Sequence, residues 1–157
     1  WYHYVIDELL AKYLPEDEKA MATGCSMGGF HAGNFFFRRP DLFDTFLSIS
    51  GFFNASFFFK DYFDPLVYDN SPVHFLRNMP SSHPWMKLYN QSKIITCVGQ
   101  GYSEEELLKG TRLLDEVLTE KNIPHWSDYW GYDVIHDWYW WHKEIKYFFT
   151  HIFGECE

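Results

Sequence analysis

The stretch Gly24-Cys25-Ser26-Met27-Gly28-Gly29 decides the fold of this 157-residue chain. It fits the pattern Gly-x-Ser-x-Gly, and the residues on both sides suit a tight turn from a strand into a helix. Residues 19–23 have the small and apolar side chains of a short buried strand, and residues 28–38 have the pattern of a helix that stops before Pro40. A serine on such a turn points its hydroxyl out of the fold. We therefore predict that Ser26 is a nucleophile on an elbow between strand and helix.

Two local features support this interpretation of the turn. Glycines at positions 24 and 28 are expected to let the strand and the helix approach without a Cβ clash. The start of the helix leaves backbone N–H groups without partners beside the serine. Such groups are suited to stabilise an oxyanion that develops during a reaction.

The composition restricts the class of protein. Hydrophobic residues make up 46% of the chain and aromatic residues 22%, enough for the core of one ordinary domain. The net charge of -9 argues against binding to nucleic acid, which needs a basic surface. No apolar stretch approaches the roughly 18 residues of a membrane-spanning helix, so we expect no membrane partner.

Three cysteines, at positions 25, 97 and 156, form an odd and scattered set without metal-ligand spacing. The pattern favours free buried thiols over a disulfide framework, and we expect no metal site. The chain also does not open on a basic segment followed by an apolar one, as a secretory signal does. These observations predict a cytoplasmic protein. Since Trp1 is not an initiating Met, we expect that the native N-terminus lies elsewhere.

Helices and strands alternate along the chain, which predicts an α/β fold with a mainly parallel sheet flanked by helices. We expect one domain over residues 1–157, with an irregular, aromatic and proline-rich excursion at about 52–92. A four-stranded sheet that begins on a helix is small, so part of the sheet is expected to be missing in front. The expected strands are at 19–23, 43–51, 93–99 and 124–131, and the expected helices at about 2–13, 28–38, 104–121 and from 138 onward.

A serine nucleophile needs a base, and the base needs a carboxylate that orients it. Of the eight histidines, His136 is the best candidate because it lies in the loop between the fourth strand and the last helix. Such loops, beyond the carboxyl ends of parallel strands, gather the site residues of this kind of sheet. His142 is expected on a solvated helix face, and His31 near the site without being the base.

For the acid, the loop after the third strand is the right element in the right order. It offers Glu104, which we favour, with Glu105 close behind. The competing interpretation is a helix N-terminus in which Ser103 is the cap and Glu106 completes a capping box. Asp128 and Asp133 are alternatives, but both lie on the element that carries the histidine.

Several motifs together resemble the Putative esterase family, a branch of the α/β-hydrolases that includes S-formylglutathione hydrolases and mycolyltransferases. The likeness runs along almost the whole chain. The motifs are 24–29 (the elbow), Arg39-Pro40-Asp41-Leu42-Phe43, Val98-Gly99-Gln100-Gly101, and Gly131-Tyr132-Asp133 leading to His136-Asp137-Trp138.

The resemblance implies a triad of Ser26 (nucleophile), His136 (general base) and Glu104 (acid), with the backbone N–H of Met27 as one oxyanion donor. It implies action on a small-molecule carboxylic ester or thioester, without a cofactor. An acyltransferase would use the same residues, and a binding or assembly module could retain them without activity.

The chain departs from the family in one respect. In members of the family, the first half of the sheet precedes the elbow, and the other oxyanion donor comes from that half. Here the elbow strand is expected to be an exposed edge that pairs with a second copy or with a partner chain.

Overall fold

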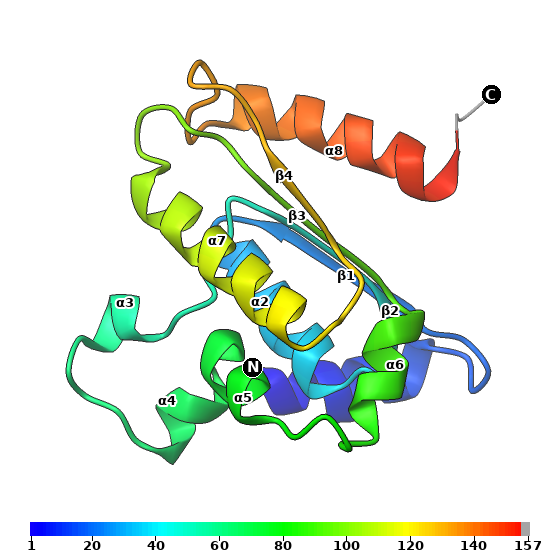
Figure 1. The fold of residues 1–157 in the computed structure, drawn as a ribbon. Coiled ribbons are helices and arrows are strands. Elements are labelled where there is room, and N and C mark those ends of the chain that lie inside the picture. The colour runs from blue at the N-terminus through cyan, green and yellow to red at the C-terminus, as the bar shows by residue number, and fades with distance from the viewer. Residues whose placement is uncertain (155–157) are drawn as a thin grey trace.

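Four parallel strands form the centre of the fold, and their order in space is their order along the chain (Figure 1). The computed structural model describes residues 1–154. The arrangement confirms the predicted α/β fold with a mainly parallel sheet. The strands are β1 (Ala20–Cys25), β2 (Phe43–Ile49), β3 (Lys93–Val98) and β4 (Trp126–Tyr129).

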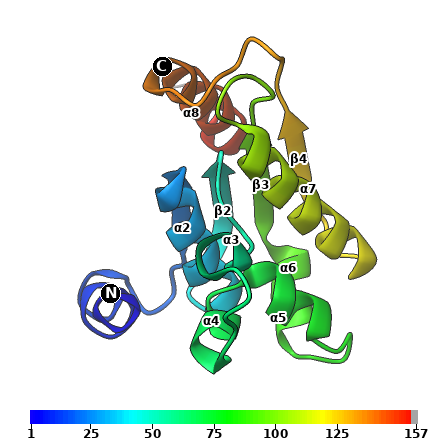
Figure 2. The ribbon, with the colours of Figure 1, turned by 90° about the vertical axis from the view of Figure 1, so that its left-hand side faces the viewer.

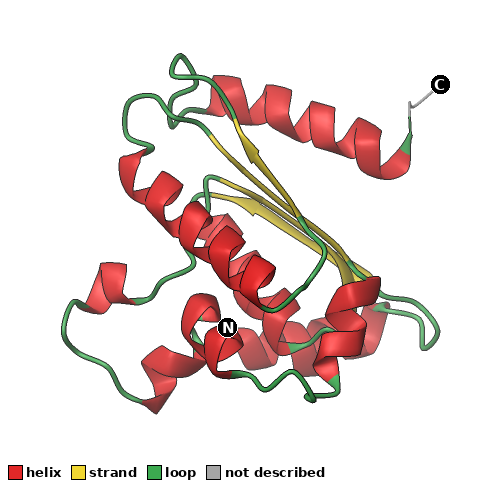
Figure 3. Cartoon of the chain, viewed as in Figure 1, coloured by secondary structure: helices red, strands yellow, loops and turns green. Residues whose placement is uncertain are grey.

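Helices cover both faces of this sheet (Figures 1 and 3). The elbow helix α2 (Met27–Arg38) and α7 (Glu105–Glu120) lie on one face, and α8 (Trp138–Phe153) lies on the other. The predicted first helix is present, but with π geometry over η1 (Tyr4–Leu10) before the short α1 (Ala11–Tyr13). Figure 2 shows this N-terminal helix beside α2, away from β3 and β4.

The connection between β2 and β3 corrects the expectation of an irregular excursion. It contains four short helices: α3 (Ser56–Phe59), α4 (Pro65–Asp69), α5 (Pro72–Asn78) and α6 (Trp85–Gln91). Pro65 and Pro72 each occupy the first turn of a helix, where the missing N–H costs nothing. Asp64 caps α4, because its Oδ1 accepts a hydrogen bond of 2.8 Å from the Val67 amide. The prolines thus begin helices here rather than prevent them.

Two apolar layers sandwich the central strands. Phe36, Phe37 and Phe46 are fully buried between the sheet and α2. On the other face, Leu47 and Phe148 belong to the layer under α8. Neighbouring residues of β2 therefore point into opposite layers, as expected for a parallel strand that is covered on both sides.

The two outer strands are β1 and β4. Within residues 1–154, β1 is hydrogen bonded to β2 along one side only, and Thr23 is exposed. No helix in the same residues is both long enough and apolar enough to cross a membrane.

Candidate active site

Ser26 lies between the last residue of β1 and the first residue of α2, as predicted. Its backbone has φ 54° and ψ -120°, a conformation that is unfavourable for a residue with a side chain and that the surrounding structure must hold. The Ser26 amide donates a hydrogen bond of 2.9 Å to the carbonyl of Ile49 at the end of β2. Ser26 is therefore tied to the neighbouring strand through its own backbone.

The steric need for glycine in the elbow differs in part from the prediction. A Cβ on Gly24 would overlap the backbone of Gly28, so position 24 must be glycine. A Cβ on Gly28 would meet open space, and the expected clash there is absent. The second close approach is at Gly29, where a Cβ would overlap the hydroxyl of Ser48.

His136 lies beside the serine hydroxyl. Its Nε2 is 2.9 Å from Ser26 Oγ, and its Nδ1 is 3.2 Å from Glu104 Oε1. A carboxylate can only accept hydrogen bonds, so Nδ1 carries the proton and Nε2 is free to accept one from the hydroxyl. This is the arrangement in which an imidazole can act as a base toward Ser26.

Glu104 lies under this histidine at the N-cap position of α7, with a side chain that is 1% exposed. Oε1 also accepts a hydrogen bond of 2.7 Å from the Ser50 hydroxyl, whereas Oε2 has no partner among the described residues. The competing interpretation, in which Ser103 caps this helix, is wrong, because Glu104 holds that position and makes no side-chain cap bond. Glu105 is exposed in the first turn of α7.

The other candidates lie elsewhere. Asp128 accepts a hydrogen bond from the indole of Trp130, and Asp133 is exposed. His142 is exposed as expected, and so is His31 on the elbow helix.

Backbone contacts fix the distance between the two loops that carry Glu104 and His136. The Gly101 amide donates to the Val134 carbonyl at 2.8 Å, and the His136 amide donates to the Tyr102 carbonyl at 3.2 Å. A Cβ on Gly101 would overlap that Val134 carbonyl, so the close approach requires glycine. Main-chain bonds thus hold the Glu104 loop and the His136 loop together.

Two groups around His136 were not predicted. The ring of Trp141 meets the imidazole edge to face, with 4.8 Å between ring centroids. Glu144, one turn further along α8, is fully buried, and its Oε1 accepts a hydrogen bond of 3.3 Å from the Cys97 thiol. Burial, reinforced by the nearby carboxylates of Glu104 and Asp128, raises the pKa of Glu144 to about 7.

Cys25 and Cys97 are free, as predicted, although Cys25 is only partly buried; Cys156 lies outside the described residues. Burial, with the nearby Glu144 carboxylate, raises the pKa of Cys25 to about 11 and that of Cys97 far above its usual range. Both thiols are therefore protonated near neutral pH, and Cys25 is a poor competitor of Ser26 as nucleophile.

A second histidine–carboxylate pair lies between β4 and α7. His125 Nε2 is 2.7 Å from Asp115 Oδ1, and its Nδ1 is 2.7 Å from the Ile123 carbonyl. Both ring nitrogens are occupied by these contacts, so the pair joins α7 to the residues just before β4.

An apolar hollow of about 400 Å³ adjoins the elbow helix. Phe30, in the first turn of α2, contributes one wall, and its amide is bonded to the Ser26 carbonyl at 3.2 Å. The remaining lining residues come from the connection between β2 and β3: Phe59, Tyr62, Asp64, Leu66, Val67 and Asn70.

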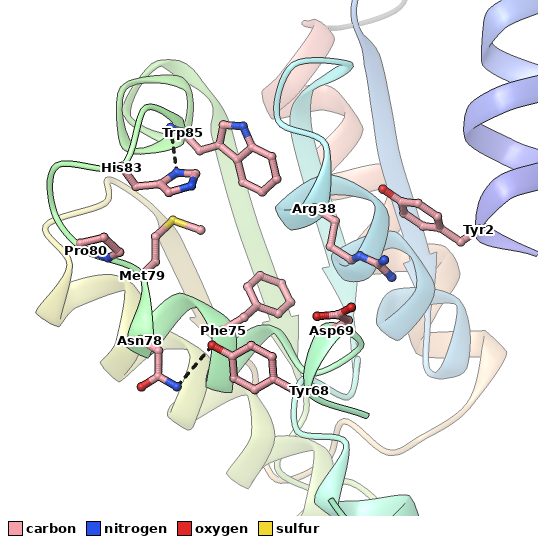
Figure 4. A pocket seen from close by; sticks show the side chains of 10 residues that line it. All are labelled: Tyr2, Arg38, Tyr68, Asp69, Phe75, Asn78, Met79, Pro80, His83 and Trp85. Atoms are coloured by element: carbon pink, nitrogen blue, oxygen red, sulfur yellow. Dashed lines mark hydrogen bonds between the residues drawn. The ribbon is translucent and has the colours of Figure 1, made fainter. Parts of the chain in front are cut away.

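Another hollow, of about 440 Å³, lies at the opposite end of α2 (Figure 4). The guanidinium of Arg38 lines this hollow, with its Cζ 4.0 Å from the centre of the Tyr2 ring, and Trp85 and Phe75 line the far side. Arg38 ends the helix that Met27 begins, which separates the two positions by about 16 Å along the axis. This hollow does not belong to the Ser26 site.

Among residues 1–154, no three His, Cys, Asp or Glu side chains are grouped as metal ligands.

Comparisons with known proteins agree with this architecture. The model of the family described as Putative esterase matches residues 1–151. A search of the curated proteins gave no match. Among solved structures, a ferulic acid esterase superposes with a TM-score of 0.75 at 20% identity, covering 97% of this chain and 61% of that one.

Two further structures are similar. The S-formylglutathione hydrolase FrmB from Staphylococcus aureus gives a TM-score of 0.67 at 20% identity, covering 97% of this chain and 60% of its own. The capsule O-acetyltransferase of Neisseria meningitidis serogroup A gives a TM-score of 0.62 at 16% identity, covering 95% of this chain and 61% of that one. At these identities the likeness shows the fold. The chain spans about three fifths of the length of these structures.

Proposed function

The chain belongs to the Putative esterase family, and on that premise we propose that it carries the acyl-transfer site of a serine carboxylic-ester hydrolase. The observation that supports this most directly is the hydrogen-bonded series Ser26 Oγ, His136 Nε2, His136 Nδ1 and Glu104 Oε1, with separations of 2.9 and 3.2 Å. In this proposal Ser26 is the nucleophile, His136 the general base and Glu104 the orienting acid.

In the first half of the reaction, Ser26 Oγ attacks the acyl carbonyl carbon while His136 Nε2 takes the hydroxyl proton. The Glu104 carboxylate stabilises the imidazolium that forms. Met27 begins α2, so its N–H has no partner within the helix and is available to the oxyanion. When the tetrahedral intermediate collapses, the bond to the alcohol or thiol breaks and the leaving group receives the proton from His136.

In the second half, water attacks the acyl-Ser26 ester. His136 Nε2 takes a proton from this water and returns it to Ser26 Oγ as the acyl bond breaks. The products are a carboxylic acid and the regenerated serine. An alcohol in place of water would give acyl transfer with the same residues, so the acceptor distinguishes a hydrolase from an acyltransferase.

The apolar hollow beside the elbow helix supports a substrate with an apolar or aromatic group. Phe30 joins the hollow to the elbow because it lies one turn after Ser26. The ring of Phe58 packs against the Phe30 ring, with 5.5 Å between the ring centroids, and extends the aromatic surface toward α3. Burial of an apolar substrate group against such rings is favourable.

A second candidate function is a binding or assembly module that retains the fold. The free side of β1 favours it, because an unpaired strand edge is a template for pairing with another chain. A dimer that covers β1, without reactivity at Ser26, would be the expected observation.

Labelling with a fluorophosphonate probe tests the hydrolase proposal. We expect stoichiometric labelling of the full chain, its loss in Ser26→Ala, and its retention in Ser103→Ala, which removes an exposed hydroxyl near the site. Hydrolysis of p-nitrophenyl acetate should follow the same pattern. Absence of labelling in protein with a native circular dichroism spectrum would refute the proposal for this chain.

A further inference from the structure

The hydroxyl of Ser50 is directed at the acid of the site. Ser50 follows the last residue of β2, is 0% exposed, and donates a hydrogen bond of 2.7 Å to Glu104 Oε1. This bond is shorter than the 3.2 Å between the same oxygen and His136 Nδ1. Ser50 is therefore the closest hydrogen-bond partner of the Glu104 side chain among the described residues.

The backbone holds Ser50 in place for this bond. Its φ is 50°, a region that side-chain-bearing residues occupy only when the structure imposes it. The Ser50 amide donates a hydrogen bond of 2.7 Å to the Cys97 carbonyl of β3. Since the preceding residue, Ile49, accepts the bond from the Ser26 amide, the end of β2 contacts both the nucleophile and the acid.

Glu104 needs such a partner. Its side chain is 1% exposed, and Oε2 has no hydrogen-bond partner among residues 1–154, so both interactions of the carboxylate are at Oε1. Without the Ser50 hydroxyl, the bond to His136 alone would oppose rotation of the carboxylate. A buried carboxylate with a single partner is also costly, because burial removes its hydration.

We propose that Ser50 is a positioning residue of this site: its hydroxyl holds Glu104 Oε1 against His136 Nδ1 and so extends the Ser26–His136–Glu104 series to four side chains. The inference rests on the proposed function for its effect on rate, but the contact between Ser50 and Glu104 is independent of it. Ser50 acts through the acid and does not touch the substrate.

Two variants separate the hydroxyl from the backbone. Ser50→Ala removes the hydroxyl and keeps a Cβ at positive φ, whereas Ser50→Gly removes the hydroxyl and relieves the backbone. We expect both to lower kcat for p-nitrophenyl acetate by about 10- to 100-fold with little change in KM, because a hydrogen bond to a charged group is lost from the machinery. Ser103→Ala and Ser103→Gly are the matched controls, since Ser103 is exposed and also has positive φ.

A double-mutant cycle identifies the partner. If Ser50 acts through the acid, Ser50→Gly should add little to the loss already caused by Glu104→Gln. Additive losses would contradict the proposal. Recovery of activity in Ser50→Gly relative to Ser50→Ala would also contradict it, because backbone strain would then account for the effect.

A readout that needs no activity keeps the two proposals distinct. The proton on His136 Nδ1 that faces Glu104 should give a downfield NMR signal, absent in Glu104→Gln. We expect this signal to shift or broaden in both Ser50 variants and to stay unchanged in the Ser103 variants. An unchanged signal in the Ser50 variants overturns the inference, whether or not Ser26 is reactive; an altered signal with an unreactive Ser26 refutes the proposed function alone.

Discussion

Glu144→Gln is expected to change how the stability of this protein depends on pH. The Glu144 side chain is fully buried beneath the site, and its Oε2 has no partner among the described residues. Burial raises its pKa from the ordinary value of 4.5 to about 7. In the unfolded chain the same carboxyl returns to its ordinary pKa, so the folded and unfolded states bind different numbers of protons between these two values.

The sign follows from that difference. Between pH 4.5 and pH 7 the folded protein keeps the Glu144 proton while the unfolded chain releases it, so the free energy of unfolding falls as pH rises through this window. Each pH unit is worth about 1.4 kcal/mol, so the whole window is worth about 3 to 4 kcal/mol of unfolding free energy. Gln does not titrate, so the variant does not lose this stability as pH rises. The free energy of unfolding of the variant, relative to that of the parent, should therefore increase by about 3 to 4 kcal/mol from pH 4 to pH 8.

Urea unfolding followed by tryptophan fluorescence measures this at several pH values. Comparing parent and variant at each pH cancels the titrations that they share. Glu105→Gln is the matched control, because it makes the same change of side chain at an exposed position. The prediction is refuted if the difference in free energy of unfolding between Glu144→Gln and the parent is independent of pH, or if it increases as pH falls.

Three further results are expected. Gly24→Ala should abolish probe labelling and lower the melting temperature, because its Cβ overlaps the elbow backbone. Gly28→Ala should leave the melting temperature unchanged or raised, since its Cβ meets open space. Equal effects of the two variants in thermal melts would contradict this prediction. Trp141→Leu should lower kcat for p-nitrophenyl acetate about tenfold because His136 loses its edge-to-face neighbour, and unchanged kcat in folded protein would show that the ring is not needed. If β1 pairs between copies, Thr23→Lys should weaken the dimer in sedimentation experiments because a charge on an edge strand opposes pairing, and a monomeric parent would exclude such pairing.

Local patterns predicted much of this molecule, and tertiary contacts explain what they missed. The elbow, the positions of the four strands along the chain and the loops of Glu104 and His136 follow from short motifs and apolar runs. The short helices within 52–92 escape prediction because a proline begins a helix as readily as it ends one. The contact of Ser50 with Glu104 spans 54 residues, so no local spacing reveals it. Its place at the carboxyl end of a predicted strand was the only available signal.

The side chains of the proposed triad are positioned by bonds that lie within residues 1–154. Ser26 is tied to the end of β2, Ser50 to β3, and the His136 loop to the loop before Glu104. All these bonds join the carboxyl ends of neighbouring parallel strands or the loops that follow them, so they depend on the register of the sheet. Stabilisation of an oxyanion is a separate contribution, since removing one donor lowers kcat by about 10²- to 10³-fold while leaving the nucleophile in place. In the proposed enzyme, labelling of Ser26 therefore depends on the register of β1, β2 and β3, whereas turnover depends in addition on how many donors besides the Met27 N–H reach the substrate carbonyl.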